Sequence, residues 1–299
     1  MQRRSVLALG AGGVAALALV GRATPAPTPG YLGAFAWQMN DPRFGGFSAI
    51  HVAEGGTRFV AISDRGYYTA GRLSRDADGR IAAVSAAPLR PLLSARGVPL
   101  TPFRSDAEGI AVGPGGIVHV SFEGSVSTRV LRYPDGIDGP AVVLPIPPAF
   151  LALGLNTALE ALAVAPDGTL YTLPEVPGAD SLFPVWRFRG GAWDQPFGLP
   201  AEGGFRAVAA DIGADGALYL LERDFAGLAG FAMRLRRFAL TDAGPTGERT
   251  LIRTEAGRHD NLEGLSVWRG PNGLVATMVS DDNFRFFQRT EIVEYLLPD

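Results

Sequence analysis

The 299-residue sequence contains no cysteine and no lysine, and it has only three histidines, at positions 51, 119 and 259. The absence of cysteine excludes disulfide bonds, thiolate metal sites and a cysteine nucleophile. The absence of lysine excludes Schiff-base catalysis and a P-loop lysine. So few histidines disfavour a histidine-cluster metal site. All 27 cationic side chains are arginines, so any anion would have to be bound by guanidinium groups.

The composition is that of a folded, turn-rich protein. Hydrophobic residues make up 47% of the chain and charged residues 19%, which is enough apolar content for a large core. The 39 glycines, 23 prolines and 17 phenylalanines favour a mostly β architecture over a helical bundle. No long segment has helical periodicity, and only residues 151–156 are expected to form a short helical turn.

The first 28 residues have the features of a twin-arginine export signal. Arg3 and Arg4 precede an uncharged apolar run over residues 6–20, and small residues follow at 23–27. The run is shorter than the ~20 residues that span a bilayer. We therefore expect a cleaved signal, a periplasmic or secreted protein, and no membrane span after cleavage; the alternative is an uncleaved N-terminal anchor.

The predicted mature chain is acidic. Removing residues 1–28 leaves 24 arginines against 30 acidic residues, a net charge of about −6. This balance gives no basic bias for nucleic acid, so none is expected as a partner.

Five segments share one plan, in which an apolar strand, a tight turn with glycine and a second apolar strand follow one another. Asp-Gly or Asn-Gly occupies three of the turns, and these dipeptides are strong hairpin signals. The segments are residues 47–64, 108–123, 160–175, 208–223 and 263–282.

The spacing of the hairpins predicts a β-propeller. Successive turns lie 60, 52, 48 and 57 residues apart, which leaves room for two further strands in each interval. We expect an all-β domain of five blades over residues 31–299. Residues 33–38 would complete the last blade beside a C-terminal strand at 290–297. Six blades remain an alternative if residues 91–104 hide a degenerate unit.

Acidic residues stand where the hairpins open. In a propeller the first strand of each blade lines the axis, so these residues would converge on one axial mouth. Like charges on paired strands repel, by about 3 kcal/mol at ~5 Å and an effective dielectric constant of ~20. The residues concerned are Asp64, Glu108 with Glu123, Glu160 with Glu175, and Glu263 with Asp282.

Three arrangements would relieve this repulsion. Calcium or another divalent cation could bind the carboxylates, since hard cations take oxygen ligands. Arginines could insert between them instead. Alternatively, a one-residue change of register could turn some carboxylates to solvent. The neighbouring arginines are Arg65, Arg104, Arg129, Arg223 and Arg285.

Several short motifs resemble those of the phytase-like family, also described by its esterase-like activity. They occur in the family's order over residues 31–298. The resemblance implies an exported propeller that hydrolyses phosphoesters or other esters. The related alkaline phytases bind calcium and use lysines as well as arginines for phosphate, whereas this chain has arginines alone. The motifs are Ser63-Asp64-Arg65-Gly66, Asp106-Ala107-Glu108-Gly109, Phe122-Glu123-Gly124, Asn156 with Glu160, Leu221-Glu222-Arg223-Asp224, Asn261-Leu262-Glu263-Gly264 and Ser280-Asp281-Asp282-Asn283.

The residues favour metal-assisted attack by water on a small ester or phosphate. No Gly-x-Ser-x-Gly elbow is present, which disfavours a serine nucleophile. The metal ligands would be Glu108, Glu160 and Glu263. Arginines would neutralise developing charge, and His259 or a free carboxylate would move the proton. A non-catalytic binding propeller and a calcium-dependent lactonase-like esterase are the alternatives. The proposed arginines are Arg65, Arg223 and Arg285.

Overall fold

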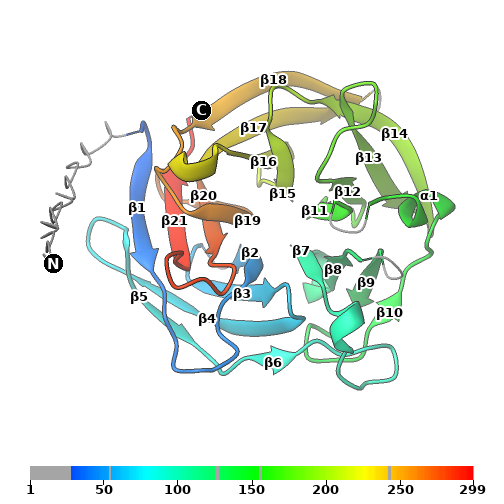
Figure 1. Ribbon diagram of the computed structural model, residues 1–299, viewed down its shortest axis with the longest axis horizontal. Coiled ribbons are helices and arrows are strands. Elements are labelled where there is room, and N and C mark those ends of the chain that lie inside the picture. The colour runs from blue at the N-terminus through cyan, green and yellow to red at the C-terminus, as the bar shows by residue number, and fades with distance from the viewer. Residues whose placement is uncertain (1–27, 54, 125–127, 155–156, 242–243, 299) are drawn as a thin grey trace, which may run out of the picture.

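The computed structural model describes residues 28–298 except 54, 125–127, 155–156 and 242–243. Its strands form five antiparallel sheets that radiate from a common centre (Figure 1). This arrangement is a five-bladed β-propeller and confirms the predicted fold. The predicted export signal lies outside the described residues apart from Thr28, and so does Asn156.

Each blade has four strands that run outward from the axis in chain order, and the fifth blade ends with the N-terminal strand. The first blade also has β6 (Arg90–Pro91), an additional short strand beside β4. The first blade contains β2 (Phe47–Ala53), β3 (Arg58–Ser63), β4 (Tyr67–Arg75) and β5 (Ile81–Ala86), and the second contains β7 (Ala107–Val112), β8 (Val118–Phe122), β9 (Arg129–Tyr133) and β10 (Val142–Val143).

The remaining blades follow the same order. The third contains β11 (Leu159–Val164), β12 (Leu170–Pro174), β13 (Leu182–Arg189) and β14 (Ala192–Pro200). The fourth contains β15 (Arg206–Ile212), β16 (Leu218–Phe225), β17 (Phe231–Thr241) and β18 (Gly244–Arg253). The fifth contains β19 (Asn261–Gly270), β20 (Gly273–Asp281), β21 (Glu291–Leu296) and β1 (Tyr31–Ala36).

The ring closes as the sequence predicts, because β1 pairs with β21 and brings both chain ends into one blade. The alternative of six blades is wrong. Residues 91–104 contribute the end of β6, an isolated bridge between Leu93 and Pro99, and the 3₁₀ turn η1 (Pro102–Arg104). The only α-helix among the described residues is α1 (Pro148–Leu151), three residues earlier than expected. No described helix is long and apolar enough to cross a membrane.

All five inner strands have a register shift near their first residue. In each blade the shift leaves one residue of the inner strand without a partner on the neighbouring strand, or two residues in the second blade. These residues form a β-bulge. A bulge turns its side chain away from the regular alternation. The bulged residues are Ser48, Glu108 with Gly109, Glu160, Val208 and Glu263.

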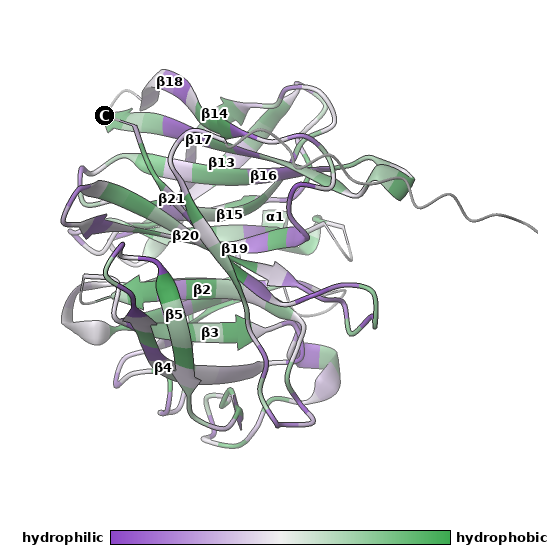
Figure 2. Ribbon diagram, turned by 90° about the vertical axis from the view of Figure 1, so that its left-hand side faces the viewer, coloured by the Kyte–Doolittle hydropathy of each residue, from purple (hydrophilic) through white to green (hydrophobic). Residues whose placement is uncertain are grey.

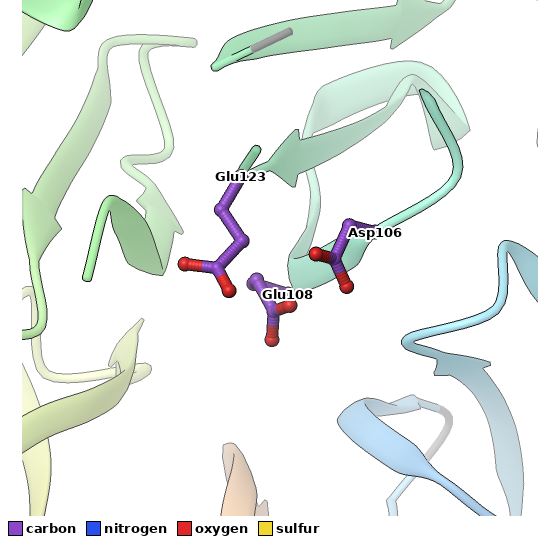
Figure 3. Close-up of side chains that lie close together, drawn as sticks. All are labelled: Asp106, Glu108 and Glu123. Carbon is purple, nitrogen blue, oxygen red and sulfur yellow. The ribbon is translucent and has the colours of Figure 1, made fainter. Parts of the chain in front are cut away.

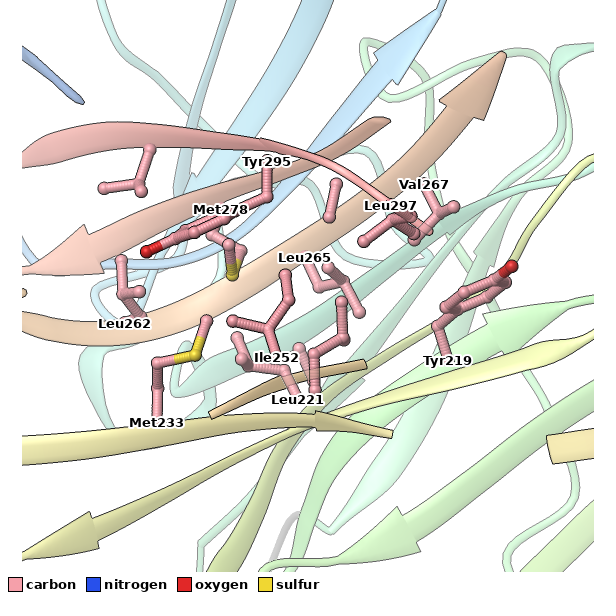
Figure 4. Close-up of a cluster of buried hydrophobic side chains, with 14 of the residues drawn as sticks. Tyr219, Leu221, Met233, Ile252, Leu262, Leu265, Val267, Met278, Tyr295 and Leu297 are labelled. Atoms are coloured by element: carbon pink, nitrogen blue, oxygen red, sulfur yellow. The ribbon is translucent and has the colours of Figure 1, made fainter. Parts of the chain in front are cut away.

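Apolar side chains fill the spaces between neighbouring blades. Leu221 and Leu235 of the fourth blade pack with Leu265, Met278 and Tyr295 of the fifth (Figure 4). The strands are coloured mainly apolar and the connecting loops mainly polar in Figure 2. Burying each large side chain stabilises the fold by about 1.5–3 kcal/mol, so the packed blades hold the loops at each end in fixed positions.

A buried ion pair joins the closing blade to the first one. Both carboxylate oxygens of Glu294 in β21 accept hydrogen bonds from Arg75 at the end of β4, at 2.6 and 2.8 Å. The Thr277 hydroxyl donates to the same carboxylate at 2.7 Å, and the Trp268 indole donates to Thr277 at 2.9 Å. The Arg75 guanidinium also stacks over the Trp268 ring. The carboxylate is thus fully paired although Glu294 is only 2% exposed.

We expect Arg75→Ala to destabilise the propeller by about 3–5 kcal/mol, because it leaves the buried Glu294 carboxylate without its cation. Urea unfolding measures this loss. The matched control is Arg90→Ala, which removes an exposed ion pair with Asp138 and should cost less than about 1 kcal/mol. Equal losses for the two variants would contradict the role assigned to the buried pair.

Candidate functional site

Carboxylates from four blades gather at one face of the propeller. We call this the mouth face: the end at which the inner strands begin and the strands paired with them end. Asp64, Glu123 and Glu175 directly follow β3, β8 and β12, while Asp281 ends β20. The three bulged glutamates lie at the same end. Burial, and then the charges of members in other blades, raise the pKa of Asp64, Glu108, Glu160 and Asp281, as expected of like charges held close together.

Three of these carboxylates lie within ligand distance of one another (Figure 3). One oxygen each of Asp106, Glu108 and Glu123 falls within a common 4.8 Å. Glu123 stands opposite Asp106, since its amide donates to the Asp106 carbonyl at 3.0 Å. The bulge brings Glu108 beside this pair. Such a set of hard oxygen donors suits a divalent cation.

Glu108 and Glu160 are buried, and the charge of Arg223 offsets only part of the effect of burial on Glu160. Each is 7% exposed, and burial raises the pKa of both carboxyls well above the ordinary value; the charges of Glu123 and Glu263 raise both further. Glu160 makes no side-chain hydrogen bond with any described residue, and neither group forms an ion pair within that part of the chain. A buried carboxylate whose charge is only partly compensated is costly, so these positions favour a bound proton or a cation.

A second acidic group lies on the side of the first and fifth blades. Burial raises the pKa of Asp64 to about 7, with contributions from Asp106 and Glu263. Burial and the charge of Glu263 raise the pKa of Asp281 to about 8. The Oδ1 atom of Asp64 is buried and has no hydrogen-bond partner among the described residues. Both halves of the site therefore contain carboxyls that favour the protonated form.

One arginine neutralises part of the ring. The fourth blade has Val208 at its bulge and contributes Arg223, which donates to the carboxylates of Glu263 and Glu175 and to Asn261. Arg206 donates to Glu175 as well, at 3.0 Å. Arginine pairing, one of the sequence alternatives, thus accounts for Glu175 and Glu263. No arginine within the described residues forms an ion pair with Asp106, Glu108 or Glu160, although the charge of Arg223 acts on Glu160.

The bulges alter the pairing expected from the sequence. Glu108 does not oppose Glu123, because Asp106 takes that place. Asp281 rather than Asp282 faces Asn261 across the sheet and interacts with Glu263. Asp106 and Asp281 are therefore members of the cluster that the sequence analysis did not select. The sequence signal that could have identified them is their position next to the predicted ligands, in Asp106-Ala107-Glu108 and Asp281-Asp282.

Asp282, proposed as a metal ligand, instead anchors the loop that follows β20. Its Oδ1 accepts hydrogen bonds from the amides of Gly46 and Phe284, both at 3.0 Å, and its Oδ2 accepts one from Thr290. These bonds occupy both oxygens with structural partners.

His259 lies apart from the carboxylates. Its Nε2 is 2.6 Å from the Tyr295 hydroxyl, and its ring packs against Tyr31 of the outermost strand. Burial, with the charge of Arg258, lowers its pKa to about 4. His259 is therefore neutral and too far within the packing of the fifth blade for the proton transfer proposed from the sequence.

Two further predicted residues are exposed on the mouth face. The Arg65 guanidinium lies 3.2 Å from the centroid of the Phe284 ring and acts on the charge of Asp64. Arg285 stacks loosely on Phe287, at 5.9 Å. Arg65 adjoins the acidic ring, whereas Arg285 lies on the loop after β20.

Comparison with known proteins identifies the family. The sequence profile described as "Phytase-like: Esterase-like activity of phytase" matches residues 42–284. The chain belongs to the phytase-like family. This match confirms the resemblance noted in the sequence motifs. No curated protein matches the chain.

Several solved structures have a similar arrangement at low identity. The catalytic domain of an α-L-arabinofuranosidase from Coprinopsis cinerea has a TM-score of 0.49 at 11% identity, covering 90% of this chain and 96% of that one. An α-L-arabinofuranosidase from Podospora anserina has 0.48 at 12%, covering 89% and 96%. A glucose dehydrogenase has 0.39 at 12%, covering 85% and 83%. The assignment of this phytase-like chain as a propeller rests on its sheet order instead.

We expect Glu160→Gln to melt at a higher temperature than the native protein in metal-free buffer, with a difference that grows from about pH 5 to about pH 8. Burial raises the folded pKa of Glu160, so the folded protein retains a proton that the unfolded chain releases. Native stability therefore falls as pH rises, and glutamine escapes this loss. Calcium should reduce the difference, because it replaces protons in the native cluster.

The control for this measurement is Glu255→Gln, which removes an exposed carboxyl. Its melting temperature should follow that of the native protein across the same pH range. A pH-independent effect of Glu160→Gln would show that the buried cluster does not carry the predicted proton.

Proposed function

We propose that this phytase-like propeller hydrolyses a phosphate or other ester at its mouth face, with a divalent cation held by Asp106, Glu108 and Glu123. The observation that carries the proposal is the convergence of these three carboxylates within 4.8 Å, next to the buried carboxyl of Glu160. Membership of the family supports ester hydrolysis as the class of reaction.

The donor set fits a hard cation such as calcium. All three groups supply carboxylate oxygens, which calcium prefers, and the chain has no cysteine that would favour a softer metal. A cation bound here would supply Lewis acidity to a phosphoryl or carbonyl oxygen. The Ala158 amide donates to Glu123 at 3.2 Å and so orients one of the ligands.

Three side chains would act on the substrate directly. Arg223 is held in place by Glu175 and Glu263, and its guanidinium would bind the negative charge that develops on the ester oxygens. Arg65 would add a second positive charge from the first blade. Burial and the neighbouring carboxylates raise the pKa of Glu160, which favours its protonated form. It would therefore donate that proton to the leaving oxygen.

We also propose that the protein works outside the cytoplasm. The support is the sequence of residues 1–28, with paired arginines, a short apolar run and small residues beyond it.

A cation titration joined to a substrate panel tests the proposed activity. We expect calcium to raise the melting temperature, and at least one of a chromogenic phosphate ester, a chromogenic carboxyl ester and a lactone to be hydrolysed. A chelator should stop turnover and added calcium should restore it. Asp106→Asn should lower kcat on the order of 10²-fold or more, because it removes a ligand and a charge from the site.

The matched control is Asp180→Asn, which makes the same chemical change at an exposed residue between β12 and β13 and should keep kcat. The panel also separates the alternatives. Turnover of carboxyl esters or lactones alone would assign a lactonase-like activity. A calcium-dependent melting shift with no turnover would identify a binding propeller, and no effect of calcium on either property would refute the proposed site.

A further inference from the structure

The mouth face carries aromatic side chains that the proposed hydrolysis does not use. Phe103 is 90% exposed, and Phe286 and Phe287 are 99% and 63% exposed. Phe103 lies in η1, before β7, and the other two lie in the loop after β20. Both segments connect strand ends at the mouth face. Rings this exposed protrude into solvent instead of lining a concave pocket, and their contact with water is unfavourable.

The loop that presents Phe286 and Phe287 is built to a fixed shape. Asn283 and Phe284 both adopt left-handed backbone conformations, with φ of 47° and 51°, which is unfavourable for residues other than glycine. The Asp281 and Asp282 carboxylates hold this turn by accepting hydrogen bonds from the Asn283 and Phe284 amides. The exposure of the two rings is thus a consequence of an ordered loop.

At the far end of the same loop, Asp260 accepts hydrogen bonds from the Gln288 side chain at 3.1 Å and from the Arg289 amide at 2.9 Å. Ser280 donates to the Arg289 carbonyl at 2.7 Å. Both ends of the loop are therefore tied to the fifth blade, on either side of the exposed rings.

The two aromatic segments form one continuous patch across the first blade. Arg65 stacks on Phe284 at 3.2 Å. The next residue, Gly66, packs so closely on Ser105 that a Cβ atom there would lie 2.5 Å from the Ser105 Cβ. Ser105 directly follows η1. We name this surface the aromatic–arginine patch; it comprises Arg65, Phe103, Arg104, Phe284, Arg285, Phe286 and Phe287.

The exposed charged side chains of the patch are arginines, whereas the carboxylates of the same segments, Asp64, Asp106 and Asp282, are half-buried beside it. Arg65, Arg104 and Arg285 form no ion pair with any residue in the described ranges, so their guanidinium groups are available to external anions. Exposed aromatic rings beside free guanidinium groups are typical of surfaces that enter the boundary between lipid headgroups and acyl chains. Guanidinium groups bind phosphate well. A second copy of the same patch would instead be repelled by like charge.

We propose that the aromatic–arginine patch docks the propeller on the surface of an anionic phospholipid bilayer, with Phe103, Phe286 and Phe287 entering the interface. The arginines bind lipid phosphates around these rings. Docking in this orientation turns the mouth face toward the membrane, so repulsion between the anionic lipids and the acidic cluster opposes the attraction of the arginines and the burial of the rings. The docking does not depend on whether the cluster is catalytic.

The absence of cysteine allows a site-specific test on the full chain. Phe286→Cys, labelled with a polarity-sensitive fluorophore, reports whether this position enters the bilayer. Val142→Cys is the matched control, because it is also exposed but lies on β10, the outer strand of the second blade. The probes are vesicles of phosphatidylcholine alone and of phosphatidylcholine mixed equally with phosphatidylglycerol. Any vesicle binding by the apolar N-terminal residues is common to both labelled chains.

We expect a blue shift of the label at position 286 with the anionic vesicles, weaker with phosphatidylcholine alone, and no shift at position 142. In the labelled chain, Phe287→Ser should weaken the partition by about tenfold, and Arg104→Gln by about fivefold at low salt.

Three results would overturn the proposal. They are no shift at position 286, an equal shift at both positions, and a shift at 286 that rises with protein concentration in the absence of vesicles. The last result would mean that a second copy of the chain covers the patch.

Discussion

Repulsion between carboxylates held around one axis is the constraint on which the chemistry of this protein depends. Five inner strands begin at the same face, and each has a bulge near its first residue. In three blades the bulged residue is a glutamate. The bulge that recurs in every blade therefore brings negative charges together near the axis. Burial prevents water from screening that charge. The ring can persist only with bound protons, paired arginines or a cation.

The ring meets this constraint differently on its two sides. The fourth blade supplies Arg223 and so neutralises Glu175 and Glu263. The second blade supplies the three carboxylates of Asp106, Glu108 and Glu123, whose oxygens lie close together. Arginine therefore compensates the carboxylates on one side of the site, while the other side presents a set of hard oxygen donors. The same asymmetry distinguishes the site from a simple network of structural ion pairs.

Much of the fold could be predicted because its signals are local. Asp167-Gly168 and the equivalent turns mark hairpins, and their spacing gives the number of blades. The site was less accessible, because a bulge of one residue determines which acid faces the axis. Asp281 instead of Asp282 joins the cluster for this reason, and Asp106 stands outside the strand pattern altogether. His259 was misplaced because its contact with Tyr295 joins segments distant in sequence, which no local pattern reveals.

Crystals of the protein soaked with manganese, a calcium substitute with an anomalous signal, test the central claim most directly. We expect one strong anomalous peak within about 2.0–2.6 Å of carboxylate oxygens from Asp106, Glu108 and Glu123, with Arg223 still paired to Glu263. The contrary result would be clear electron density for these carboxylates with no anomalous peak beside their oxygens at a saturating manganese concentration. The acidic ring would then be neutralised by protons and arginine alone, and the proposed metal-assisted chemistry would fail.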